Sequence, residues 1–109
     1  MEVSPMVAAR CPIRTSLELL GGKWKMLLIQ QLKNEPKRYG QLKSALPDVS
    51  EKMLTQELRQ LVSDGLLLRT DYRELPPRVE YSLTPLGREV IPLIEALATF
   101  GNSYQQQRL

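Results

Sequence analysis

The chain has 109 residues, of which 42% are hydrophobic and 25% charged, so one globular domain with a modest core is expected rather than a disordered chain. It contains one cysteine and no histidine, so a Ser-His-Asp or Cys-His catalytic site and a Cys/His zinc finger cannot be built, and we expect no enzyme, no metal and no cofactor. A disulfide within the chain is excluded as well. The net charge is +3, with +4 in residues 1–60 and −1 in residues 61–109, which suggests an anionic partner such as nucleic acid, although a surface of mixed charges is the plain alternative.

Helical periodicity dominates the first half of the chain. Residues 1–10 show none and are predicted to be a flexible N-terminal arm, whereas apolar residues recur at helical spacing in about 12–20, 24–32 and 39–46. Pro12 suits the first turn of the first of these helices. No apolar run reaches the length of a signal peptide core or a transmembrane helix, so we expect a cytoplasmic, nucleoid-associated protein without a membrane partner.

A fourth helix and a hairpin follow. Ser50 stands at the N-cap of a helix that runs to about Ser63, and Gly65 closes it. The pattern then alternates, as in β-strands, over residues 66–71 and 78–83, with a loop between them. Together with the preceding helices, this pattern predicts a mainly α fold with a small β-hairpin.

The last predicted helix begins at Thr84-Pro85, a hydroxyl N-cap followed by proline, and covers about residues 85–104. Pro92 lies inside this helix and is expected to kink it. The apolar residues of the helix alternate steps of four and three, which is the spacing of a helix-packing seam. We expect this seam and the first helix to form a homodimer interface. The candidate interface residues are Ile13, Leu17, Leu93, Leu97, Phe100 and Tyr104.

The order of elements is that of the winged variant of the helix-turn-helix. Residues 39–64 would form the helix-turn-helix and residues 66–83 the wing, within a single domain that covers residues 11–109. The additional helix at each end exceeds what so small a core needs. This excess is the reason why both terminal helices are candidates for dimerisation.

The fourth helix separates an apolar side from a polar side, and the polar side is the one that would enter the major groove of double-stranded DNA. Arg59 could bind guanine and Gln56 adenine, because their planar groups match the major-groove edges of these bases. The other candidate contacts on this helix, to phosphates or bases, are Ser50, Lys52 and Thr55. The plain alternative is the polar outer face of an ordinary amphipathic helix.

Three arginines outside this helix are candidate contacts to the DNA backbone. Arg38 precedes the third helix, and Arg73 and Arg78 flank the proline-containing loop of the hairpin, where guanidinium groups would reach phosphates or the minor groove. Arg78 lies at the start of a strand, so it could instead pair with Glu74 or Glu80.

The chain resembles the HxlR-type winged-helix transcriptional regulators, a family within the broader MarR-like group. The resemblance covers residues 11 to about 101. It rests on residues 11–12, 22–24, 38–39, 42, 54–59, 61, 64–66, 69 and 76–87. It implies a bacterial or archaeal regulator that binds DNA as a homodimer through its fourth helix, with terminal helices that form the dimer. Tyr39 and Phe100 stand where the family usually has phenylalanine and tryptophan, and both substitutions keep an aromatic ring.

Cys11 is a candidate redox sensor. It directly precedes the first predicted helix and lies between Arg10 and Arg14, and a helix N-terminus and nearby cations favour the reactive thiolate. Several members of the family that the chain resembles use a cysteine at this position to sense oxidants or electrophiles. As the only cysteine, it could form a disulfide only across a dimer or with a small thiol. The alternative is a small buried residue without a signalling role.

Two other interpretations of the function remain open. The regulator could respond to a small-molecule effector rather than to an oxidant, with Cys11 taking no part. The fold could also serve as a protein-interaction module that never reads DNA, although an acidic or apolar outer face would then be expected on the fourth helix.

Overall fold

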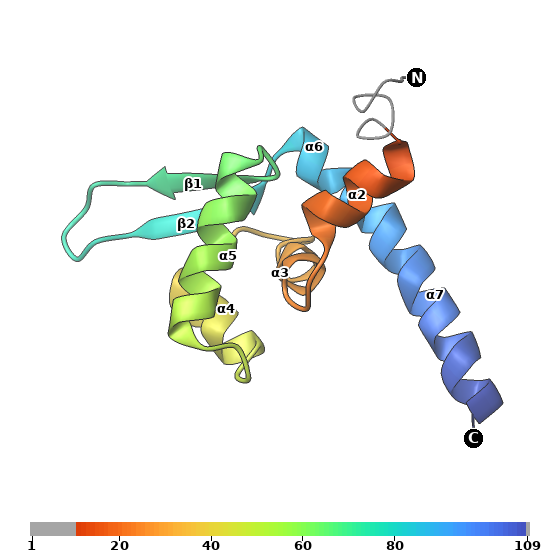
Figure 1. Ribbon diagram of the computed structural model, residues 1–109. Helices are drawn as coiled ribbons and strands as arrows, with labels where there is room; N and C mark the ends of the chain where they lie inside the picture. The colour runs from red at the N-terminus through yellow and green to blue at the C-terminus, as the bar shows by residue number, and fades with distance from the viewer. Residues whose placement is uncertain (1–10, 109) are drawn as a thin grey trace.

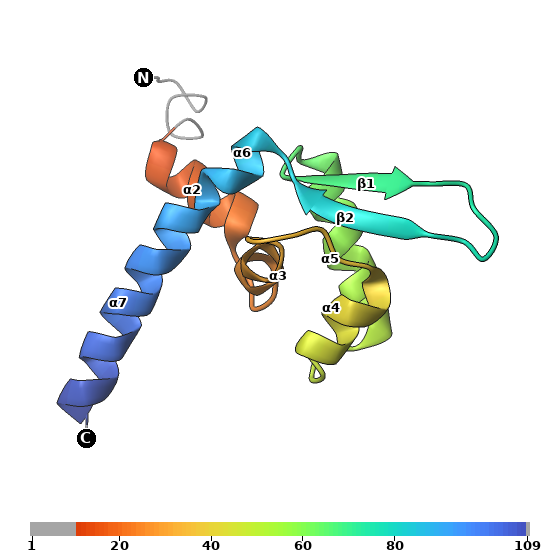
Figure 2. The ribbon, with the colours of Figure 1, turned by 180° about the vertical axis from the view of Figure 1, so that it is seen from behind.

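The computed structural model describes residues 11–108, and the predicted arm of residues 1–10 lies outside the described residues. This part of the chain is mainly helical and contains a single two-stranded antiparallel hairpin, which confirms the predicted fold class. The hairpin projects at one end and the last helix at the other, with the other helices grouped between them (Figures 1 and 2). The elements are α2 (Pro12–Leu20), α3 (Lys25–Gln31), α4 (Tyr39–Ala45), α5 (Glu51–Ser63), β1 (Leu67–Asp71), β2 (Val79–Leu83), α6 (Pro85–Arg88) and α7 (Val90–Arg108).

The hydrophobic core lies behind α5. Leu54, Leu58 and Leu61 are 0–1% exposed, and these are the positions that helical spacing places on one side. Burial of one such side chain stabilises the fold by about 1.5–3 kcal/mol. The other side chains of this cluster with at most 2% exposure are Leu28, Ile29, Leu32, Leu42, Val49, Leu66 and Leu67. The core therefore fixes α5 from one side and leaves the opposite side to solvent.

Both ends of α5 are set by local chemistry. The Ser50 hydroxyl accepts a hydrogen bond from the backbone N–H of Met53 at 3.0 Å, which confirms the predicted N-cap. Gly65 follows the helix with a φ of +79°, a conformation in which a Cβ atom would be strained. Sequence and structure therefore agree on where this helix begins and ends.

The base of the hairpin is held by the segment before α4 and by the side chain of Thr84. In the pairing of β1 with β2, Leu67 lies opposite Leu83 at the base of the hairpin, and Asp71 lies opposite Val79 at the other end. Lys37 and Tyr81 exchange two backbone hydrogen bonds, of 3.0 and 2.8 Å, so the segment before α4 lies along the outer edge of β2. The Thr84 hydroxyl donates a hydrogen bond of 2.6 Å to the Gly65 carbonyl where the hairpin closes.

The C-terminal segment differs from the single kinked helix predicted over residues 85–104. The structure divides it at Glu89 into α6 and α7, and α7 continues to Arg108. Pro92 explains the division, since it has no N–H to donate to the Arg88 carbonyl and is tolerated only in the first turn of a helix. The Thr84 hydroxyl accepts from the Gly87 N–H at 3.0 Å, which confirms the predicted start at Thr84-Pro85. In the described part of the chain, no helix combines the length and apolar character needed to cross a membrane.

Candidate nucleic-acid interface

The outer side of α5 carries the polar residues that the sequence assigned to DNA. Lys52, Thr55, Gln56 and Arg59 are all exposed. With Glu51 and Tyr39 they line an open hollow of about 480 Å³. The structure therefore brings four of the five predicted recognition-helix residues to one continuous face.

Tyr39 joins α4 to the beginning of α5. Its hydroxyl donates a hydrogen bond to the Glu51 carbonyl at 3.2 Å and accepts one from the Thr55 hydroxyl at 3.5 Å. Ser50, the fifth predicted residue on this helix, uses its hydroxyl oxygen to cap α5. Thr55 and Ser50 thus contribute to the position of the helix as well as to its surface.

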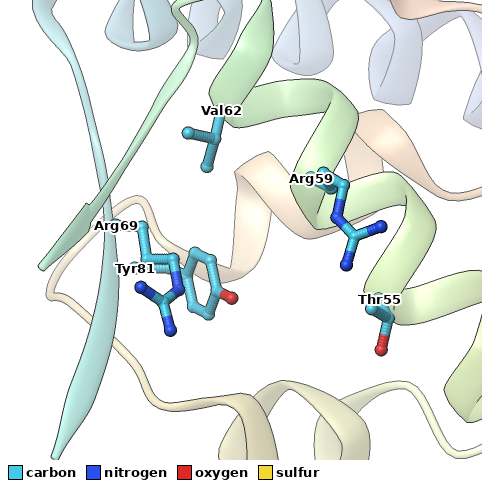
Figure 3. Close-up of a pocket in the computed structure, with 5 residues that line it drawn as sticks. All are labelled: Thr55, Arg59, Val62, Arg69 and Tyr81. Carbon is cyan, nitrogen blue, oxygen red and sulfur yellow. The ribbon is translucent and has the colours of Figure 1, made fainter. Parts of the chain in front are cut away.

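A second hollow, of about 270 Å³, lies between α5 and the hairpin. Its lining residues are Thr55, Arg59, Val62, Arg69 and Tyr81. Figure 3 shows the guanidinium groups of Arg59 and Arg69 projecting into it from α5 and β1, with the Tyr81 ring beside Arg69. Sequence reasoning did not select Arg69 as a site residue. Strand alternation could have found it, because Arg69 pairs with Tyr81 and shares the face of buried Leu67.

The arginines predicted to contact the DNA backbone differ in how firmly they are held. Arg38 and Arg73 have exposed side chains. The Arg78 guanidinium lies 3.7 Å from the centre of the Tyr72 ring, and its Nε lies 3.5 Å from a carboxylate oxygen of Glu74. The structure thus contains the Arg78–Glu74 pair that the sequence left as an alternative to a DNA contact.

The phenol of Tyr72 completes this cluster in the hairpin. It donates a hydrogen bond of 3.1 Å to the Glu80 carboxylate. This hydrogen bond, and then the negative charge of Glu80, raise the pKa of Tyr72 above its ordinary value, while the Arg78 charge opposes the shift. A phenol is protonated at neutral pH in any case, so the raised pKa extends to higher pH the range in which Tyr72 donates this hydrogen bond to Glu80.

The residues predicted for the dimer interface are exposed along α2 and α7. Ile13, Leu17, Leu93 and Leu97 line one apolar groove of about 290 Å³ between these two helices. The exposed fractions are 72% for Ile13, 67% for Leu17 and 69% for Phe100. Phe100 and Tyr104 continue the apolar face along α7 beyond the groove. This arrangement leaves large apolar side chains uncovered on the single chain.

Cys11 occupies the N-cap position of α2, and its side chain is exposed rather than buried within the single chain. Of the two cations predicted to flank it, Arg14 lies 3.5 Å from Glu18 in an ion pair one turn along α2. Arg10 lies outside the described residues. The thiol is therefore accessible, and one neighbouring arginine already has a carboxylate partner.

Three helices, a turn and a hairpin that flanks a polar helix face define the winged helix-turn-helix class of DNA-binding proteins. The chain belongs to the HxlR-like helix-turn-helix family, whose model matches residues 19–109. This match confirms the resemblance found in the sequence. The chain is accordingly a transcriptional regulator with a DNA-binding helix-turn-helix.

Individual relatives agree with this assignment. The chain is 39% identical to YdeP, an uncharacterized HTH-type transcriptional regulator of Bacillus subtilis (strain 168). The 97 aligned residues are 89% of this chain and 76% of YdeP. A MarR-family regulator structure from Porphyromonas gingivalis W83 is 48% identical with a TM-score of 0.83, covering 93% of this chain and 96% of that one. The structure of the redox regulator HypR in its oxidized form is 38% identical with a TM-score of 0.80, and the match covers 85% of this chain and 96% of the HypR chain.

Proposed function

We propose that the chain binds a pseudo-palindromic DNA operator as a homodimer, with α5 in the major groove of each half-site. The observation that carries this proposal is the outer face of α5, where Lys52, Gln56 and Arg59 are exposed on a helix fixed from behind by buried leucines. A two-fold axis would place the two α5 helices about 34–36 Å apart, one turn of the duplex. The dimer would carry a net charge of +6, twice +3, so its affinity should fall steeply with salt.

The first test is selection of genomic DNA fragments by the purified, reduced protein at near-physiological salt. Enrichment of a few palindromic sites is the expected result, and it would also provide the operator sequence. No enrichment above bulk DNA would contradict sequence-specific binding and favour a protein-interaction module. The same fragments serve as probes in the experiments below.

Arg59→Ala is expected to weaken operator binding by about 1–3 kcal/mol and to relax the preference at one base pair of each half-site, because the guanidinium matches the edge of guanine. The measurement is a binding series over operators with single base changes. Gln60→Ala is the matched control, since Gln60 lies on the same helix but bonds to Asp64 rather than lining either hollow. An unchanged footprint and unchanged affinity of Arg59→Ala would contradict the assignment.

The proposal of a homodimer rests on the apolar face of α2 and α7. Exposed large apolar side chains on a small domain are usually covered by a partner. Ile13, Leu17 and Phe100 belong to the two terminal helices, which lie apart from the outer face of α5 (Figures 1 and 2). A second copy on this face would leave both α5 helices free for DNA.

For the signal, we propose that oxidation of Cys11 releases the protein from DNA in the cytoplasm, at the nucleoid. The exposed thiol and the similarity to HypR, a redox regulator, support this proposal. The two Cys11 thiols of a dimer would form one disulfide across it. An oxidant such as diamide would accept the two hydrogens of the thiols and be reduced to the corresponding hydrazine. The alternative signal is a small-molecule effector bound between the dimer helices and the DNA-binding unit, with Cys11 taking no part.

Cys11→Ser is expected to keep operator binding after treatment with diamide, whereas the unmodified protein should lose it and regain it with dithiothreitol. The measurement is fluorescence anisotropy of a labelled operator, with the covalent product identified by mass spectrometry. Binding that persists in oxidized, unmodified protein would exclude Cys11 as the switch and favour the effector.

A further inference from the structure

The hollow between α5 and the hairpin contains two arginines from different elements. Arg59 and Arg69 reach it from α5 and β1, and Tyr81 of β2 stands beside Arg69 (Figure 3). No carboxylate is among its lining residues, which are completed by Thr55 and Val62. The hollow is therefore a concave surface with two positive charges and two hydroxyl groups.

Within residues 11–108, neither Arg59 nor Arg69 forms an ion pair or a side-chain hydrogen bond. Other arginines of the chain do so: Arg14 pairs with Glu18, and Arg88 donates to the Lys33 carbonyl at 3.2 Å. Both side chains are exposed and line the same hollow, so an anion placed in it would be attracted by two positive charges. A phosphate suits this position, because guanidinium presents paired N–H donors that match its oxygens.

The shape of the DNA duplex identifies the phosphate. With α5 in the major groove and the hairpin directed at the neighbouring minor groove, the sugar-phosphate strand that separates the two grooves passes between them. The hollow occupies this position between α5 and the hairpin.

We infer that Arg69 and the hydroxyl of Tyr81 bind one backbone phosphate at the edge of the major groove, next to the base that Arg59 reads. This inference rests on the proposed DNA binding. Tyr81 is well fixed for the task, because its backbone N–H and C=O are both hydrogen-bonded to Lys37 on the outer edge of β2, while Arg69 lies opposite it in the hairpin. Arg69 thereby sets how deeply Arg59 enters the groove, and it carries no base preference of its own.

Arg69→Ala is expected to lower the affinity about tenfold or more for both the selected operator and a scrambled duplex of the same length, because a charge-assisted hydrogen bond is lost in each half-site. The slope of log K against log salt should fall by about 0.9 for each lost phosphate, or about 1.8 for a dimer. Base preferences should stay unchanged, in contrast to Arg59→Ala. Tyr81→Phe, which removes only a neutral hydroxyl, should weaken binding without changing the slope.

Arg14→Ala is the matched control, because it removes an exposed arginine of α2 outside the hollow and should leave the slope unchanged. An unchanged slope and affinity for Arg69→Ala, while the unmodified protein binds the operator, would overturn the inference and leave the proposed function standing. A relaxed preference at one base pair would overturn it as well, since Arg69 would then read a base. If the unmodified protein selects no operator, the proposed function itself fails.

Discussion

Leu97→Asp is expected to convert the proposed dimer into a folded monomer. Leu97 lines the apolar groove with Leu93 on α7, and a dimer would bury the new carboxylate without a partner in both copies. An unpaired buried charge costs about 3–5 kcal/mol, which weakens dimerisation by at least about a hundredfold. Because the side chain is 45% exposed on the single chain, the substitution leaves the core of the domain intact. Light scattering should report half the mass, with an unchanged helical circular dichroism signal.

Asn102→Asp is the matched control for this prediction. It adds the same charge to an exposed position of α7 that lies about 140° around the helix from Leu97. The control should remain a dimer and bind the operator, whereas Leu97→Asp should lose high-affinity binding, because one half-site alone supplies half of the contacts. A dimer mass for Leu97→Asp would refute the proposed interface.

Gly87→Ala is expected to reduce the free energy of unfolding by about 1–3 kcal/mol through overpacking. A Cβ atom at this buried position would meet the carbonyl oxygen of Leu66 well inside van der Waals contact and lie 3.1 Å from its carbonyl carbon. The carbonyl cannot move away freely, since it accepts a hydrogen bond of 3.1 Å from the Thr84 N–H. Urea denaturation should show the loss as a lower midpoint with an unchanged slope.

Gly40→Ala provides the comparison for Gly87→Ala. Gly40 is also in a helix, but its added Cβ would meet nothing within 4 Å. This variant should be neutral or more stable by about 0.4–1 kcal/mol, because alanine restricts the unfolded chain. Equal stability of the two alanine variants would mean that the close approach of α6 to the Leu66 backbone is relaxed at little cost.

Local chemistry made much of this fold predictable from the sequence. Ser50 and Gly65 define the ends of α5 through a cap and a positive φ, and both effects involve only neighbouring residues. The inward side of α5 follows from spacing alone. These local rules were sufficient to predict the helix order, the hairpin and the exposed face with Lys52 and Arg59.

Features that depend on contacts distant in sequence were not predictable. The edge pairing of Lys37 with Tyr81 and the hollow shared by Arg59 and Arg69 both require the hairpin to be docked on the helices. The division of the last helix at Glu89 was missed for a different reason. The seam spacing continues through Pro92, whereas the lost hydrogen bond interrupts the backbone. The contacts with DNA and the dimer interface stay predictions.

The two ends of the hairpin differ in how they are held. Its base is held by Lys37 along the outer edge of β2 and by the hydroxyl of Thr84, which directly follows β2, whereas at its tip Leu75 is 95% exposed. The backbone at Arg69 lies in the paired part of the hairpin, so a DNA contact there loses little conformational entropy on binding, whereas Arg73 lies in the loop beyond the strands and should lose more. Contacts near the base of the hairpin would supply affinity, and contacts from the loop would let one protein follow minor grooves of different width.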